Sequence, residues 1–129
     1  ERASPAPAPP PPLTQAALAL EERLRAAGHE PPDEDGIGAP ADLAALRAAG
    51  RAVRVGRAMY AHPDAIDEVR RRVVAIVEAE GAVTLGRLRD ELQTSRKYAQ
   101  ALLEHLDAAR VTRRLPDDSR VLRRGRPGP

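Results

Sequence analysis

The sequence contains no cysteine, no phenylalanine and no tryptophan, and only two of its 129 residues are tyrosine. Without cysteine the chain cannot form disulfides, thiolate zinc sites or a thiol nucleophile. With aromatics at 2%, any core must be small and built from Leu, Val, Ile and Ala. No apolar run approaches the roughly 20 residues that span a bilayer, and no signal peptide is visible. We therefore expect a cytoplasmic protein without membrane contact.

Motifs for catalysis and for cofactor binding are also absent from the sequence. No phosphate-binding loop of the GxxxxGK[ST] type occurs. The three histidines, His29, His62 and His105, lack the spacing of metal ligands, and the adjacent acids at 33–35 lack the alternation of a calcium loop. Ser95 has no neighbouring base and suits a helix cap. We expect no enzymatic activity, no metal and no cofactor in this chain.

The charge is nearly balanced overall but unevenly distributed. The formal net charge is +2, yet residues 110–126 contain seven basic residues and only two acidic ones. This clustering predicts that a polyanionic partner would bind near the C-terminal end. A solvated, arginine-rich surface is the alternative, and it explains the amount of arginine better than its clustering.

The first half of the chain predicts a small helical unit. Residues 1–12 are a Pro/Ala tract that favours an extended spacer, and the start without Met indicates a segment of a longer protein. Residues 13–28 have helical spacing, whereas 29–39 are rich in Pro, Gly and acids and predict a loop. Pro40 favours the start of a second helix, and Gly56-Arg57 indicates a two-residue hairpin turn.

The second half repeats this order with one additional helix. Helices are expected after His62, after Thr84 and after Ser95, the last two residues serving as hydroxyl caps. Two β-like runs, 111–115 and 120–123, then flank a turn.

Helices followed by a hairpin in each half predict a mainly α fold with small β-hairpins (α+β), that is, tandem winged helices. The expected limits are a linker at 1–12, a first unit at 13–62, a second unit at 63–124 and a tail at 125–129. Because the junction is short, we expect the two units to be rigidly stacked.

Basic residues at the start of the third helix of the second unit indicate a phosphate ligand. Arg96 and Lys97 occupy the first turn, where the helix dipole favours anions and a bound phosphate would compensate the charge. In the hairpin, alternation places Arg113 and Arg114 on opposite faces, so only about half of such arginines can face one ligand.

The third helix favours RNA over DNA as the partner. A helix that reads the major groove would present base-reading Asn, Gln or Arg. Here Glu104 and Asp107 are expected on the outer face and would repel phosphates. Contact through the helix start and the hairpin suits an RNA hairpin, whose deep, narrow major groove excludes a helix.

Three segments resemble the last winged helix of the bacterial selenocysteine-specific translation elongation factor (SelB) family: TSRKYA at 94–99, LLEHLD at 102–107 and VTRR at 111–114. GRAMYAHP at 56–63 resembles the wing and exit of the preceding winged helix. The resemblance implies an RNA-binding arm that grips the selenocysteine insertion hairpin in mRNA. GTP, Mg²⁺, the ribosome and selenocysteinyl-tRNA are implied only for domains outside this sequence.

The resemblance also implies which residues touch RNA. Ser95, Arg96 and Lys97 would hold backbone phosphates, and the wing residues would flank the RNA loop and any bulged base. The implied wing residues are Thr112, Arg113, Arg114, Arg123 and Arg124. We expect a monomer. A DNA-binding winged-helix regulator, which would dimerise, and a protein-interaction arm with an exposed apolar patch remain as alternatives.

Overall fold

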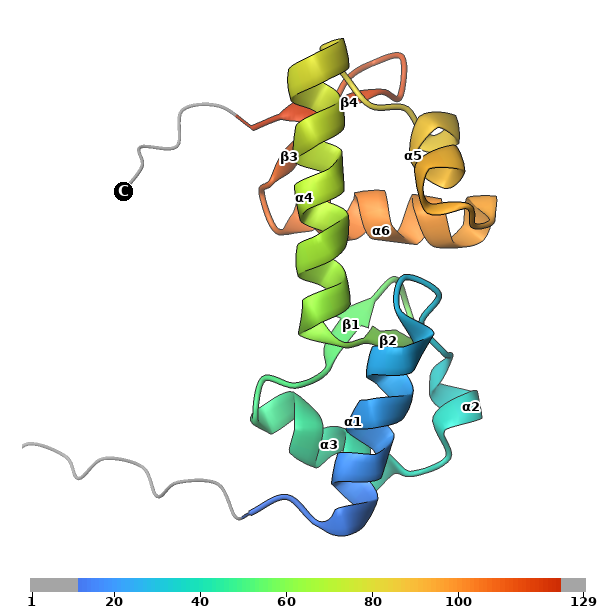
Figure 1. The fold of residues 1–129 in the computed structure, drawn as a ribbon, viewed down its shortest axis with the longest axis vertical. Coiled ribbons are helices and arrows are strands. Elements are labelled where there is room, and N and C mark those ends of the chain that lie inside the picture. The colour runs from blue at the N-terminus through green and yellow to red at the C-terminus, as the bar shows by residue number, and fades with distance from the viewer. Residues whose placement is uncertain (1–11, 124–129) are drawn as a thin grey trace, which may run out of the picture.

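The computed structural model describes residues 12–123, which form two helical units stacked along the long axis of the molecule (Figure 1). Residues 1–11 of the spacer predicted at 1–12, Arg124 and the tail predicted at 125–129 lie outside the described residues. The elements in chain order are α1 (Gln15–Ala27), α2 (Glu34–Ile37), α3 (Pro40–Ala48), β1 (Val53–Val55), β2 (Met59–Ala61), α4 (Pro63–Glu80), α5 (Leu85–Leu92), α6 (Arg96–Ala108), β3 (Thr112–Arg114) and β4 (Arg120–Leu122). The predicted mainly α class with two small antiparallel hairpins is confirmed.

Helix boundaries in both units follow the capping chemistry of the sequence. The Thr14 hydroxyl accepts a hydrogen bond from the Ala17 amide at 3.0 Å, and α1 ends at Gly28 with a φ of 59°. Thr84 caps α5 in the same way, accepting from the Arg87 amide. Pro40 opens α3, as expected for a residue without an N–H at the first helical position. None of the described helices is both long and apolar enough to cross a membrane.

The segment 29–39 was expected to be a loop, and this prediction is wrong in part. One helical turn, α2, lies within it, and Asp33 forms an antiparallel β-bridge with Met59. A four-residue helix is too short to show a helical repeat in the sequence. In the second unit Val83 bridges Arg120 in the same manner. Both units therefore share one order: helix, bridge, helix, helix, hairpin.

The first hairpin turns over three residues rather than the two expected. Val55 pairs with Met59, which leaves residues 56–58 as the loop. Gly56 has a φ of +66°, a conformation that glycine tolerates best, and a Cβ there would lie 3.4 Å from the Met59 Cε and 3.7 Å from the Ala101 Cβ. The loop therefore lies close to α6 of the second unit. This is a long-range contact that the sequence of the hairpin does not predict.

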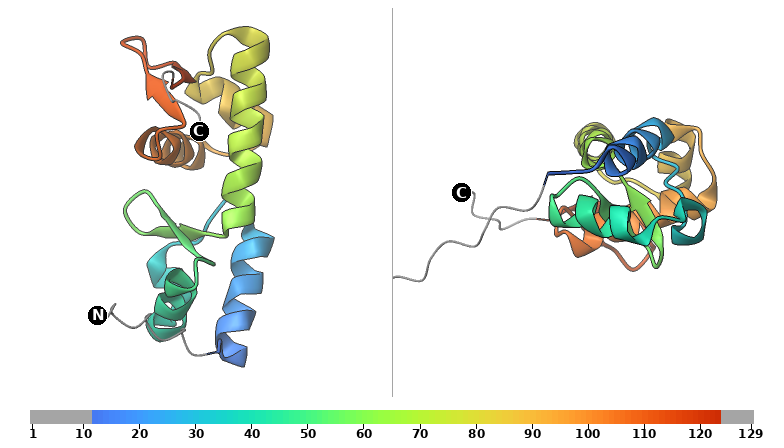
Figure 2. Two further views of the ribbon diagram at one scale, coloured as in Figure 1. Left: turned by 90° about the vertical axis from the view of Figure 1, so that its left-hand side faces the viewer. Right: turned by 90° about the horizontal axis from the view of Figure 1, so that it is seen from below.

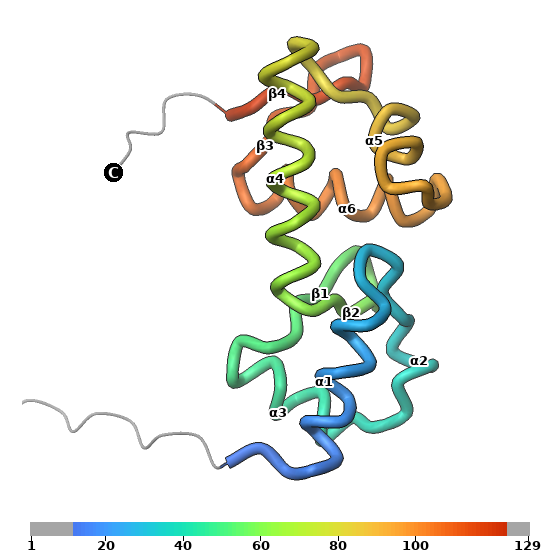
Figure 3. The backbone as a smooth tube through the Cα atoms, viewed as in Figure 1, coloured from blue at the N-terminus to red at the C-terminus, as the bar shows by residue number. Residues whose placement is uncertain are grey.

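The β1–β2 hairpin lies between two hydrophobic cores and packs against both, with β2 buried throughout. Ala52 and Tyr60 join the core of α1–α3, whereas Val55, Met59 and Ala61 join the core of α4–α6. Alternation along a strand sends neighbouring side chains to opposite faces, so one short hairpin serves both cores. Figure 3 shows the hairpin between the two groups of helices. The domain limits predicted at 62 and 63 stay a prediction, because the hairpin packs on both sides.

The buried carboxylate of Glu21 in α1 connects the two units where the hairpin leads into α4. Glu21 of α1 is 4% exposed and accepts from Arg51 at 2.9 Å and from the His62 Nε2 at 3.0 Å. The His62 Nδ1 accepts the Asp64 amide at the start of α4, so Nε2 carries the proton. Arg25 adds bonds to both Glu21 and Asp64. One network therefore ties α1, the hairpin and α4 together, and α4 continues beyond α1 along the same side (Figure 2).

Glu21→Gln is expected to destabilise the protein by about 1.5–3 kcal/mol, because the buried carboxylate that accepts hydrogen bonds from His62, Arg51 and Arg25 is lost. The His62 hydrogen bond, with the two guanidinium groups, lowers the Glu21 pKa below its usual range. A lowered carboxyl pKa contributes stability above the unfolded value of about 4.3, and this is lost as pH falls through the folded value. Thermal unfolding of both proteins between neutral pH and pH ~3 measures this. An equal loss of stability in the variant on acidification would contradict it.

Candidate nucleic-acid interface

Ser95 stands at the predicted cap position of α6, but its side chain makes no capping hydrogen bond. The prediction of the position is confirmed and that of the capping bond is wrong. The hydroxyl, Arg96 and Lys97 are all exposed at the helix start, and the first turn of α6 contains no acidic residue. The amide groups of this turn thus have no compensating acid on their own helix.

Acidic residues of the first unit lie beside the start of α6 instead. The Thr94 hydroxyl donates to the Glu30 carboxylate at 2.6 Å, and the Lys97 Nζ lies 3.9 Å from the Asp33 carboxylate. Lys97 also lies over the Tyr98 ring, 5.4 Å from its centroid. Acidic residues of the first unit therefore partly replace the acids that the first turn of α6 lacks. This weakens the case for a phosphate held by Lys97, a point that local sequence cannot reveal.

Arg96 lines an open recess between the start of α5, the outer face of α6 and the tip of the β3–β4 hairpin. This hairpin is the wing of the second unit. Within residues 12–123 the Arg96 guanidinium makes no ion pair and no side-chain hydrogen bond. The recess is lined by Thr84, Leu85, Gly86, Arg96, Gln100, Glu104, Arg114, Asp117, Asp118 and Arg120. The first amides of α5 open onto it, and a helix start of this kind attracts anions. Sequence inspection missed this α5 contribution, whose only signal was the Thr84 cap.

The two faces of the wing differ in charge compensation. Arg114, whose side chain lies on the recess side, donates to the Asp118 carboxylate at 2.6 and 2.9 Å, and this bond raises the Arg114 pKa. Arg113 points to the opposite face, as alternation predicted, and is exposed. Within residues 12–123 the guanidinium groups of Arg113, Arg123 and Arg110 make no ion pair. Arg124 lies outside the described residues.

Thr112 is a core residue of the wing rather than a surface contact. It is 1% exposed, and its hydroxyl donates to the Asp107 carboxylate at 2.6 Å. Asp107 also accepts from Arg120, a buried residue, at 3.0 Å. The expectation that Asp107 projects from the outer face of α6 and repels phosphates is wrong, because this carboxylate is neutralised within the fold. The Asp107–Arg120 pair fixes the wing against α6.

The outer face of α6 is partly covered by the first unit. Ala101 is only 7% exposed because the β1–β2 loop packs against it. Glu104 is exposed, as expected, and accepts from Gln100 at 3.1 Å. His105 is half-buried, and burial lowers its pKa, which favours a neutral ring. This contact reduces the part of the outer face of α6 that is open to a partner.

The structure therefore brings together only some of the sequence-predicted residues. Arg96 and Arg114 line one recess, whereas Lys97 turns toward the first unit and Arg113 toward the opposite face of the wing. Ser95 is exposed at the helix start, and Thr112 is buried. Arg110, which follows α6 with a φ of +65°, was not selected from the sequence, although it falls within the basic stretch.

The order of helices, bridge and hairpin in each unit defines the winged-helix class, and the chain is a tandem of two such units. Residues 75–122 match the family described as "Elongation factor SelB, winged helix". The resemblance seen in the sequence is confirmed. The comparison with curated proteins gave no match.

Two solved structures are similar to the chain over 86% of its length. One is the mRNA-binding domain of elongation factor SelB from E. coli in complex with SECIS RNA, with a TM-score of 0.69, 24% identity and 99% of that chain covered. The other is a bacterial selenocysteine-specific elongation factor, EF-Sec, with a TM-score of 0.72 and 22% identity. Only 19% of that second chain is covered, so this chain spans about a fifth of its length. These likenesses show the fold.

Asp107→Ala is expected to lower the free energy of unfolding by about 3–5 kcal/mol, because the buried Arg120 guanidinium would lose its partner. Chemical denaturation followed by circular dichroism measures this. Glu104→Ala removes a carboxylate from the same helix on its exposed side and serves as the control, with an expected change within about 0.5 kcal/mol. Equal effects of the two substitutions would contradict a structural role for Asp107.

Proposed function

We propose that this chain is the RNA-binding arm of a selenocysteine-specific translation elongation factor and recognises a selenocysteine insertion hairpin in mRNA. The observation that carries the proposal is the recess in which the uncompensated Arg96 lies beside the start of α5 and the wing residue Arg114. This geometry offers a cation and oriented amides to a phosphate while leaving the wing tip beside it for the RNA loop. The SelB family match over residues 75–122 supports the same partner.

Recognition of UGA would require parts of the protein beyond this sequence. In the proposed role the arm acts in the cytoplasm as a monomer and has no catalytic site, metal or cofactor of its own. GTP, Mg²⁺, selenocysteinyl-tRNA and the ribosome would be engaged by other domains. The solved E. coli domain that resembles this chain was in complex with SECIS RNA, which makes the same kind of hairpin the first ligand to test.

Two observations favour RNA over the alternative partners. Because the β1–β2 loop covers Ala101, less of α6 is open to a DNA major groove than in a helix that serves as a recognition helix. Among residues 12–123 Leu18 is the single large hydrophobic residue that is exposed, so the described surface carries no apolar patch for a protein partner.

Fluorescence anisotropy with three labelled probes across a salt series tests the proposal. The probes are an RNA hairpin with a bulged loop, the same stem closed by a plain tetraloop, and a DNA duplex. We expect preference for the bulged hairpin that persists as salt rises, because base contacts outlast phosphate contacts. Tightest binding to the DNA duplex would favour a transcriptional regulator. Equal, steeply salt-dependent binding to all three probes would leave only a basic surface.

Arg96→Ala is expected to weaken binding of the bulged hairpin about tenfold and to lower the salt slope by about one unit, as for one lost phosphate contact. Lys97→Ala should have a smaller effect, since Asp33 and Tyr98 already engage that ammonium group. Arg71→Ala, an exposed arginine paired with Glu68 on α4, is the matched control and should leave binding unchanged. An unchanged slope for Arg96→Ala would rule out the recess as the phosphate site.

A further inference from the structure

Several of the arginines that have no carboxylate partner among residues 12–123 lie on one side of the molecule. On α4 and α5, Arg71, Arg72 and Arg87 are each paired with glutamates at 2.7–3.0 Å. Within the described residues, no such partner is found for Arg54 and Arg57 of the first hairpin. The arginines of α4 and α5 are therefore neutralised by carboxylates, whereas those of the first hairpin are not. An arginine-rich composition alone does not explain this uneven pairing.

The uncompensated residues of the first hairpin border a groove against α6. The groove is lined by Arg54, Gly56, Arg57, Glu104, His105 and Ala108, so it joins the first unit to the second half of the helix. Its only carboxylate is Glu104, which is already hydrogen-bonded to Gln100. His105 contributes no fixed charge at neutral pH, because burial lowers its pKa.

The position of Arg54 is fixed by its own turn. The Arg54 Nε donates to the Arg57 carbonyl oxygen at 2.7 Å, which leaves the two terminal nitrogens of the guanidinium free to donate. Gly56 holds this turn against Met59 and Ala101, so the loop is anchored on α6. A guanidinium that is held in place before binding loses less conformational freedom when it meets a phosphate.

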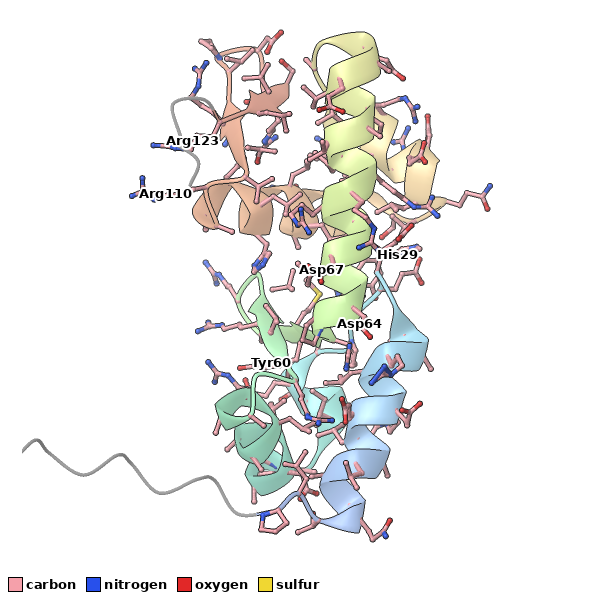
Figure 4. The ribbon with its side chains drawn as sticks, turned by 60° about the vertical axis from the view of Figure 1, so that its left-hand side comes forward. His29, Tyr60, Asp64, Asp67, Arg110 and Arg123 are labelled. Carbon is pink, nitrogen blue, oxygen red and sulfur yellow. The ribbon has the colours of Figure 1, made fainter. Side chains whose placement is uncertain are left out.

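The same side of the molecule continues upward to the base of the second wing. Arg110 and Arg123 point together to this side, away from α4, and nitrogen-bearing side chains also project there from the β1–β2 hairpin below (Figure 4). The Arg123 amide donates to the Val111 carbonyl at 3.0 Å, which keeps the start and the end of the wing together. Cationic groups thus follow one side from the second wing to the loop of the first.

We propose that the β1–β2 loop, through Arg54 and Arg57, makes a second and sequence-independent contact with the phosphate backbone of the bound RNA. The inference rests on the proposed function and extends it to the first unit. The contact falls on the stem of the RNA hairpin, beyond the loop that the recess and the second wing engage. A backbone contact of this kind adds affinity and register but reads no base.

Two RNA hairpins with the same bulged loop test this, one with a short stem and one with the stem lengthened by a helical turn. The wild-type chain is expected to bind the longer hairpin about tenfold more tightly. Arg54→Ala/Arg57→Ala should remove this gain and lower the salt slope for the longer hairpin by about two units, one for each phosphate contact. Its affinity for the short hairpin should be unchanged, which also shows that the variant is folded.

Arg70→Ala/Arg71→Ala removes the same charge from α4 and should keep the whole gain, because its side chains are paired with acids there. Arg54→Lys/Arg57→Lys should keep only part of it, because lysine retains the charge but lacks the Nε that holds Arg54 on the Arg57 carbonyl. A wild-type chain that gains nothing from the longer stem, or an alanine variant that keeps the gain, overturns the inference. Failure of the wild type to prefer either hairpin over a DNA duplex would overturn the proposed function instead.

Discussion

The β1–β2 hairpin packs against both hydrophobic cores, and this double packing holds the two units together. A two-stranded hairpin is marginal alone, and here it is stabilised because Tyr60 joins the lower core while Val55 and Met59 join the upper one. The Glu21 network locks the same hairpin to α1 and α4. The two units are therefore one body, and α6 is held between its own core and the wing of the other unit.

This packing changes what α6 can do. In an isolated winged helix the third helix is free to enter a groove, but here Ala101 is covered and Thr94 and Lys97 contact the acids of the first unit. What remains open is the recess at Arg96, the wing and the groove beside Arg54. The tandem arrangement thus directs binding to helix starts and loops, which suits folded RNA better than duplex DNA.

The sequence predicted those features that local chemistry determines. Pro40 and Thr84 marked helix starts, because caps and first-turn residues depend on neighbouring residues. The repeat of periodic helices before hairpins gave the fold class. Features set by distant residues could not be read: the single turn of α2, the pairing of Asp107 with Arg120, and the acids that face Lys97. The same limit applies to the candidate site, since Arg96 and Arg113 look alike in sequence but face different surroundings.

Amide chemical-shift mapping of the ¹⁵N-labelled chain with a bulged RNA hairpin locates the RNA on the surface of the protein. We expect the largest shifts at Gly86, Arg96 and Arg114, with further shifts at residues 54–57 when the stem is long. The outward-facing surface of α4, where Arg71 and Arg72 are paired with Glu68, should remain unshifted. Shifts centred on that surface, with none at the recess, would contradict the account.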